Sequence, residues 1–277
     1  MRQRRLRVEL RRSRDGSGLT QDQVAESLDW SLSKVIRIES GAVNISTTDL
    51  RALLSLYGVA EERIAELVTL ARAARERAWW SGYKKVISQQ YYDLIGYESA
   101  AAAIRQFEPL VIPGLLQTQE YAHAYISGII SPERRGDVDA LVEVRMRRQE
   151  ILERDHPPLL FFIVDESTVR RQIGGPRVMR EQLRHLVELA SHPQVVIEVV
   201  PFTAGVHPGL QGAFTILEFA SAEDDDVLHL ESPRDMRVTR DLQEAVVTYR
   251  ETFEQLRELS LRPEGTAVLL NRLAEEL

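Results

Sequence analysis

The sequence predicts two domains of different class: an all-α, five-helix domain in residues 1–77, and an α+β domain with a small, mainly antiparallel sheet in residues 78–277. Two observations support this division. Apolar residues recur at helical spacing through the first part, between recognisable cap residues. Short apolar, β-branched runs appear only after Pro157-Pro158, and they alternate with helical patterns. A chain of 277 residues with 44% hydrophobic content can bury both cores.

Residues 18–41 contain two short helical patterns joined by a tight turn. Thr20 is a candidate N-cap, and Gln23 three residues later completes a capping box. The second pattern begins after a cap at Ser31 and stops before Gly41. This arrangement predicts a helix-turn-helix.

The second helix of this pair presents Leu32, Ser33, Ile36 and Arg37 outward. In a helix-turn-helix, residues so placed reach base edges in the major groove. Arg37 is the best reader because a guanidinium can donate twice to guanine, a contact that discriminates by ~1–3 kcal/mol. Ser33 can bond several bases, the two aliphatic side chains can contact a thymine methyl, and Lys34 suits phosphate better than a base. We therefore expect the protein to bind double-stranded DNA.

The strings Leu19-Thr20-Gln21, Ser33-Lys34 and Arg37-Ile38-Glu39-Ser40-Gly41 make residues 2–58 resemble the DNA-binding domain of phage-repressor-like, XRE-type transcription factors. The resemblance implies that Gln21 and the loop residue Asn44 contact the DNA backbone. It also implies a partly buried structural ion pair between Arg14 and Glu39. Asp29 stands where the family usually has glycine in the turn, so we expect a turn with some backbone strain.

The segment 79–125 holds two of the three tryptophans and six of the eight tyrosines. A hydrophobic core with amphipathic rims is the interpretation we place first. The alternative is a pocket for a ligand or partner, because aromatic and convergent polar groups line such sites. Its candidate residues are Trp79, Trp80, Tyr83, Arg105, Glu108, Gln117 and Tyr121, with His207 from a later Gly/Pro-rich loop.

Further along, the sequence predicts a long charged helix at 132–155, strands at 159–164, 195–201, 213–219 and 227–230, and helices at 176–191, 241–261 and 263–277. The run Arg145-Met146-Arg147-Arg148-Gln149 could suggest nucleic acid. Its acidic neighbours favour a salt-bridged, solvent-facing helix instead.

Three further strings, Trp79-Trp80-Ser81-Gly82-Tyr83, Val111-Ile112-Pro113-Gly114-Leu115-Leu116-Gln117-Thr118 and His207-Pro208-Gly209, are similar to a second known domain. That domain has no characterised function and follows XRE-type heads in actinobacteria, and the similarity covers residues 79 to about 275. The resemblance implies a regulator of development or secondary metabolism. Such regulators are often encoded beside a small partner protein, in an antitoxin-like arrangement.

Charge is divided unevenly along the chain. Residues 1–77 hold 14 Lys and Arg against 11 Asp and Glu, a net charge of +3; residues 78–277 hold 21 against 31, a net charge of −10. An acidic body would weaken non-specific adhesion to DNA and leave the reading to the head. The alternative interpretation is that the second domain is acidic only because many cytoplasmic domains are.

The sequence gives no support for a metal site, a membrane protein or an enzyme. The chain has no cysteine, and its six histidines, from His123 to His229, lack the spacing of a metal motif, so we expect no metal and no cofactor. No apolar run approaches the ~18 residues of a membrane helix, and we expect no membrane partner and a cytoplasmic location. Asp165-Glu166 and His207 are a conceivable acid–base pair. Adjacent carboxylates more often cap a helix, and we expect no enzymatic activity.

Together these features predict a sequence-specific transcriptional regulator that binds an operator as a homodimer. A small-molecule effector or a partner protein would act through the second domain. The alternative is a protein-interaction module whose head only localises it to DNA.

Overall fold

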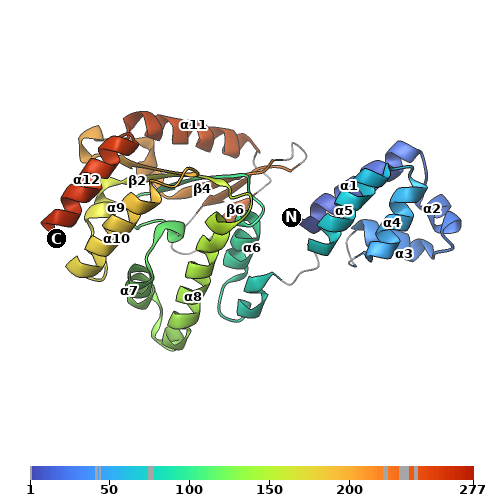
Figure 1. Ribbon diagram of the computed structural model, residues 1–277, viewed down its shortest axis with the longest axis horizontal. Helices are drawn as coiled ribbons and strands as arrows, with labels where there is room; N and C mark the ends of the chain where they lie inside the picture. The colour runs from blue at the N-terminus through green and yellow to red at the C-terminus, as the bar shows by residue number, and fades with distance from the viewer. Residues whose placement is uncertain are drawn as a thin grey trace. The chain divides into compact units, whose positions relative to one another are not determined.

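The computed structural model describes residues 2–40, 43, 45–73, 78–220, 224–230, 237–239 and 243–277. The chain divides into two compact units, residues 1–81 and 82–277, shown in Figure 1. The boundary expected after residue 77 adjoins the segment 74–77, which lies outside the described residues. Within the described ranges, no helix has the length and apolar character that crossing a membrane requires.

The first unit confirms the predicted all-α class. Its helices are α1 (Arg2–Ser17), α2 (Gln21–Ser27), α3 (Leu32–Ser40), α4 (Thr47–Leu56) and α5 (Glu61–Ala73). One apolar core joins them, with Leu10, Val35 and Leu53 each at most 1% exposed. Gly58 takes a φ of 73° just after α4, a left-handed conformation that glycine adopts without steric cost.

The second unit confirms the α+β class. Its helices are η1 (Trp79–Tyr83, at the boundary), α6 (Gln89–Glu98), η2 (Gly114–Leu116), α7 (Gln119–Ile129), η3 (Pro132–Asp137), α8 (Val138–Gln149), η4 (Glu150–Glu153), α9 (Glu166–Arg170), α10 (Pro176–Leu189), η5 (Phe202–Ala204), η6 (Pro208–Gln211), α11 (Gln243–Leu259) and α12 (Pro263–Glu276). The single helix expected at 132–155 is therefore three consecutive helical segments, of which α8 is the longest.

The strands are β1 (Ala103–Glu108), β2 (Leu159–Asp165), β3 (Val195–Val200), β4 (Phe214–Glu218), β5 (Val227–Leu230) and β6 (Arg237–Thr239). They form one mixed sheet in the order β3-β2-β1-β4-β5-β6. The β1·β2 and β2·β3 pairs are parallel, and the other three are antiparallel. Antiparallel pairs predominate as predicted, but the sequence reasoning missed β6 and β1, and β1 lies inside the sheet.

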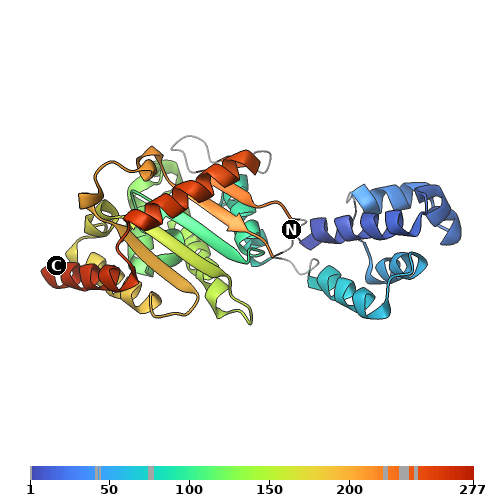
Figure 2. The ribbon, with the colours of Figure 1, turned by 90° about the horizontal axis from the view of Figure 1, so that it is seen from above.

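Helices cover both faces of this sheet. α11 packs on one face, over a core that includes Phe107, Phe214 and Phe253. The other face carries the larger core, with Ile104, Phe162 and Ile197 beneath α7 and α10. Figure 2 shows α11 lying along its face of the sheet. Because successive side chains of a strand point to opposite faces, neighbouring residues of β1 belong to different environments.

Candidate nucleic-acid interface

The helices α2 and α3 form the predicted helix-turn-helix. Thr20 Oγ1 accepts a hydrogen bond from the backbone N of Gln23 at 3.3 Å, and Gln23 Oε1 accepts one from the backbone N of Thr20 at 2.9 Å. This capping box satisfies donors that the start of α2 would otherwise leave free. At the start of α3, Ser31 Oγ accepts a hydrogen bond from the backbone N of Lys34 at 3.3 Å. Both helix starts are thus fixed by their own side chains.

The turn between these helices places Asp29 at a φ of 54°, and no other non-glycine residue in the described ranges has a positive φ. The backbone N of Trp30 then donates to the carbonyl of Ala25 at 2.8 Å and closes the turn. A left-handed conformation is strained for residues with a side chain, although less so for aspartate than for most. The strained turn expected at Asp29 is confirmed.

The outer face of α3 is open to solvent. Leu32 is 38% exposed and Ile36 is 43% exposed, and Ser33 and Arg37 are also exposed, whereas Val35 on the inner face is fully buried. The Arg37 guanidinium makes no hydrogen bond or ion pair with any residue the structure describes. Its donors are therefore available to an external acceptor.

A buried carboxylate holds the first three helices together. Glu39 Oε1 accepts a hydrogen bond from Arg14 Nε at 2.8 Å, and Glu39 Oε2 accepts one from Gln21 Nε2 at 2.7 Å. The Glu39 side chain is 1% exposed and that of Arg14 17%. Arg14 Nη1 also donates to the carbonyl of Leu19 at 3.0 Å. The hydrogen bond with Glu39 raises the pKa of Arg14. We call this group the Glu39 clamp.

The residues expected to contact phosphate have other partners or lie outside the description. Lys34 Nζ is 2.9 Å from Asp49 Oδ1, and Gln21 is part of the Glu39 clamp. A phosphate would have to compete with Asp49 for Lys34. Asn44 lies outside the described residues.

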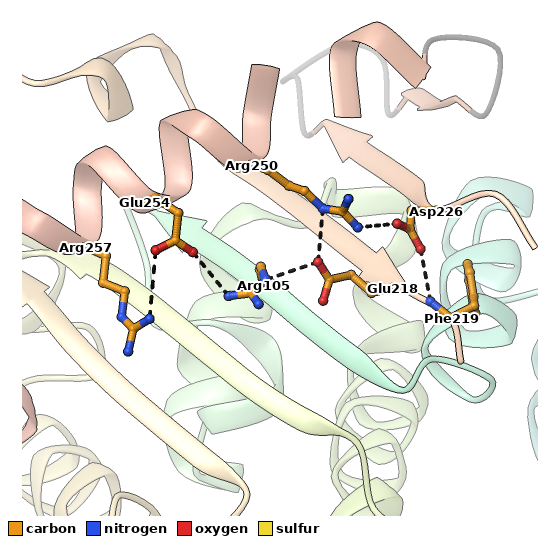
Figure 3. A network of polar contacts seen from close by, with 7 residues as sticks. All are labelled: Arg105, Glu218, Phe219, Asp226, Arg250, Glu254 and Arg257. Atoms are coloured by element: carbon orange, nitrogen blue, oxygen red, sulfur yellow. Dashed lines mark hydrogen bonds and ion pairs between the residues drawn. The ribbon is translucent and has the colours of Figure 1, made fainter. Parts of the chain in front are cut away.

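The candidate pocket residues of the second unit do not converge. Arg105 lies on the α11 face of the sheet, where its Nε donates to Glu218 Oε1 at 3.2 Å. Figure 3 shows it inside a network of alternating charges that also includes Arg250 and Glu254 of α11. Arg105 therefore joins α11 to the sheet. It shares no pocket with Gln117, which lies among the elements of the opposite face.

Gln117 and Tyr121 are fully buried. Gln117 Nε2 donates to the carbonyl of Ile112 at 2.7 Å, and Tyr121 OH accepts from the backbone N of Ile112 at 3.1 Å. Burial raises the pKa of Tyr121 to about 12. Both side chains hold the connection after β1 in place, so neither is open to a ligand.

Trp79, Trp80 and Tyr83 all belong to η1. The two indole rings meet edge to face with centroids 5.5 Å apart, and Tyr83 OH donates to Glu143 Oε1 at 2.6 Å. These three aromatic residues are partly buried.

His207 and Asp165, the conceivable acid–base pair, are in contact: His207 Nε2 is 3.3 Å from Asp165 Oδ2. Asp165 Oδ1 also accepts from the backbone N of Ser167 at 2.8 Å and caps α9. Glu166 accepts from the backbone N of Phe202 at 2.8 Å. The His207 side chain is 3% exposed. All three groups thus have structural partners within the fold.

Two arginines of α8 were misplaced by the sequence reasoning, which put them on a solvent face. Arg148 is 8% exposed and forms a two-pronged ion pair with Glu98 of α6, with Nε 2.9 Å from Oε2 and Nη2 2.5 Å from Oε1. Arg145 donates from Nη1 to Gln117 Oε1 at 2.9 Å. The solvent-face prediction is wrong because Glu98 lies 50 residues away in sequence, beyond the reach of any local charge pattern.

Two known protein families have models that match parts of the chain. Residues 5–67 match the family model described as Helix-turn-helix domain. Residues 91–272, more than half of the chain, match the model described as Domain of unknown function (DUF5753). No curated protein and no solved structure shows significant similarity to the chain.

Proposed function

Because the chain belongs to the family of the Domain of unknown function (DUF5753) and carries a helix-turn-helix domain, we propose that it is a sequence-specific transcriptional regulator. The helix-turn-helix is the architecture of DNA-binding regulators. The proposal assigns sequence reading to α3 and regulation to the second unit, in the cellular compartment that holds the DNA.

The observation that carries this proposal is the state of the charges around α3. Glu39 and Lys34 already have partners inside the domain, whereas Arg37 is exposed and has no partner among the described residues. Its neighbours on the outer face, Leu32 and Ile36, add apolar surface that suits thymine methyl groups. Arg37 is thus the side chain best placed for two hydrogen bonds to guanine.

The regulator would act as a homodimer. One recognition helix reads only a few base pairs, and two heads spaced about one helical turn apart, ~34 Å, multiply the specificity. An effector that binds better to one arrangement of the heads would change operator affinity by its preference for that arrangement. This role requires binding by the second unit and no catalysis.

A partner-binding module is the second candidate, and a specific observation favours it. Leu110, Phe202, Val206 and Leu210 are 63%, 57%, 91% and 62% exposed. They lie in the loops that follow β1 and β3 and precede β4, which all meet at one end of the sheet. Exposed apolar side chains so grouped suit a protein partner.

Selection from a random DNA library at ~150 mM salt, followed by salt titration, tests the regulator. We expect an inverted-repeat motif bound far more tightly than a scrambled sequence. Arg37→Ala should lose the preference at one base pair of each half-site, by roughly 10–100-fold, because a bidentate contact is worth ~1–3 kcal/mol.

Arg51→Ala is the matched control. Arg51 is an exposed head arginine on α4, 48% exposed and paired with Glu61 at 2.9 Å. It should leave the selected motif unchanged. Equal and steeply salt-dependent binding of the wild type to both sequences would favour the partner-binding module, because it would reflect phosphate contacts alone.

A further inference from the structure

A small polar cavity of about 60 Å³ lies in the second unit, between the sheet and the helices α6, α7 and α8. Gln106 and Glu108 of β1 and Thr215 of β4 form its sheet side. Glu98 of α6 and the two arginines of α8, Arg145 and Arg148, are among the residues that face them. Of the candidate pocket residues named from the sequence, Glu108 lines this cavity.

The charge of Arg148 is balanced within the fold. Both oxygens of Glu98 accept hydrogen bonds from its guanidinium, and Arg148 Nη1 donates to Tyr91 OH. Burial by itself lowers the pKa of Arg148, but Glu98 and Tyr91 outweigh burial and raise it. The Arg148–Glu98 pair therefore brings no net charge to the cavity.

The charge of Arg145 is not balanced. Its Nη1 donates to the neutral amide of Gln117, and its guanidinium lies 5.9 Å from the ring centroid of Tyr125. Its Nε is buried and has no hydrogen-bond partner. Across the described ranges, no carboxylate oxygen lies within 4.0 Å of this guanidinium. A guanidinium binds a carboxylate through strong, charge-assisted hydrogen bonds, and no described carboxylate makes such bonds with Arg145.

Gly114 keeps open the space next to both guanidiniums. A Cβ built on Gly114 would lie 3.4 Å from Nη1 of Arg145 and 3.4 Å from Nη1 of Arg148. The two cationic groups thus approach one small volume from which a side chain is missing. Glu98 already neutralises Arg148, so an anion in this volume would meet Arg145 as the guanidinium without a described carboxylate partner.

A neutral polar group lies next to Thr215 on the same face of the sheet. His229 of β5 is the register partner of Thr215, so the two side chains lie on the same face. His229 is 1% exposed and its Nε2 has no hydrogen-bond partner. Burial first, and then the nearby charge of Arg148, lower the pKa of His229 to about 4. Near pH 7 it is neutral and adds no competing charge.

We propose that this cavity binds a small monocarboxylate that accepts hydrogen bonds from the guanidinium of Arg145. At 10–15 Å³ per water position, the cavity holds roughly four heavy atoms, the size of acetate. The planar guanidinium edge matches a carboxylate in shape. A phosphate dianion would instead bring two negative charges beside Glu98 and Glu108. The role of the carboxylate as an effector rests on the proposed function, whereas its binding does not.

Calorimetry and thermal melting of the full chain without DNA test this site, with acetate as the probe. Acetamide has the same shape without the charge, and chloride keeps the ionic strength constant. We expect acetate, but not acetamide, to raise the melting temperature. The proposal would be overturned if acetate and acetamide had equal effects or if about 50 mM acetate had no effect. Binding of phosphate in place of acetate would also overturn it.

Arg145→Gln should weaken acetate binding by at least about tenfold, because charged hydrogen bonds are lost. Arg184→Gln is the matched control, since Arg184 lies on α10, is 59% exposed and pairs with Glu181. Unchanged acetate affinity in Arg145→Gln would overturn the assignment.

Gly114→Ala supplies a variant that keeps both arginines. The backbone of Gly114 is outside the left-handed region, and its new methyl group would meet only the ends of two long side chains. We expect a folded protein that no longer binds acetate, because the methyl group takes part of the cavity. Acetate binding at wild-type affinity in this variant would place the anion elsewhere. Neither result depends on whether the head reads DNA.

Discussion

The regions around α3 and α8 each contain one arginine that is paired with a buried carboxylate and one that is not. The two arginines without a carboxylate partner differ in what they face. Each region has one arginine held by a buried carboxylate: Arg14 by Glu39 in the head, and Arg148 by Glu98 in the second unit. Each also has one arginine with no carboxylate partner among the described residues, Arg37 and Arg145. Arg37 faces solvent, whereas Arg145 faces a small cavity.

This difference in direction determines the kind of anion each arginine can bind. An outward guanidinium is accessible to a polyanion of any length, and salt screens the contact. An inward guanidinium accepts only an anion small enough to enter, and the lower dielectric makes its binding less sensitive to salt. The arginines with a carboxylate partner hold the fold, and the two without one among the described residues are those that we propose bind ligands.

The largest effect on stability is expected when the two arginines of α8 are replaced one at a time. Arg148→Met leaves the buried Glu98 carboxylate without a counter-ion and should cost about 3–5 kcal/mol of unfolding free energy. Arg145→Met removes a cation that has no carboxylate partner among the described residues, so it should be neutral or stabilising in chloride buffer. Urea denaturation of both variants measures the difference. Equal losses would mean that Arg145 also has a structural role.

The head offers the corresponding test at the Glu39 clamp. Glu39→Ala should lower the unfolding free energy by about 2–4 kcal/mol, because Arg14 and Gln21 both lose their acceptor. The cost is smaller than for Arg148 because Arg14, at 17% exposed, still reaches water. Arg37→Ala serves as the control and should denature like the wild type. A stable Glu39→Ala protein would contradict a structural role for the clamp.

Acid should affect the second unit, because all six histidines lie there, between His123 and His229. Among them, His229 has a strongly lowered pKa. The pKa of His229 falls from 6.5 to about 4 on folding, so the unfolded chain binds its proton more readily between these values. Stability should therefore be fully present above pH 6.5 and decline as pH falls toward 4, by on the order of 3 kcal/mol.

His229→Gln should remove this part of the pH dependence while other groups keep theirs. Denaturation of both proteins at pH 7, 6, 5 and 4 gives the difference, and parallel curves for variant and wild type would refute the assignment. His123→Gln, at a side chain 56% exposed, is the control.

The smallest expected effect is at the turn of the head. Asp29→Gly should stabilise the head by up to about 1 kcal/mol, because glycine adopts a φ of 54° without steric cost. Asp29→Ala should destabilise it, since alanine lacks the local hydrogen bonding that helps aspartate in this conformation. Neither substitution should change acetate binding. A gain with alanine equal to that with glycine would show that the aspartate side chain, and not the φ angle, causes the strain.

Local patterns predicted the head well because its determinants are local. The capping box of Thr20 and Gln23 and the cap at Ser31 each act within three residues of sequence. The exposed face of α3 follows from the 3.6-residue period alone. The partners of Lys34 and Gln21 did not follow, because Asp49 and Glu39 lie 15 and 18 residues away.

The second unit was predicted in class but not in its key contacts. β1 was missed because its sequence, Ala-Ile-Arg-Gln-Phe-Glu, mixes apolar and charged residues, and its pairing with β2 and β4 appears only in three dimensions. Without β1, the opposite facing of Arg105 and Gln106 could not be derived. Glu98 and Arg148 lie on different helices, and nothing in the local pattern indicates that they meet.

The position of β1 within the sheet has a consequence for synthesis of the chain. Ala103 pairs with Glu218, so the second unit cannot complete its sheet until most of the chain has left the ribosome. The contacts of the head, in contrast, are complete once residue 81 has emerged. A nascent or truncated chain would complete its helix-turn-helix before the cavity exists. Under the proposed function, it would therefore gain DNA binding earlier than control by the second unit.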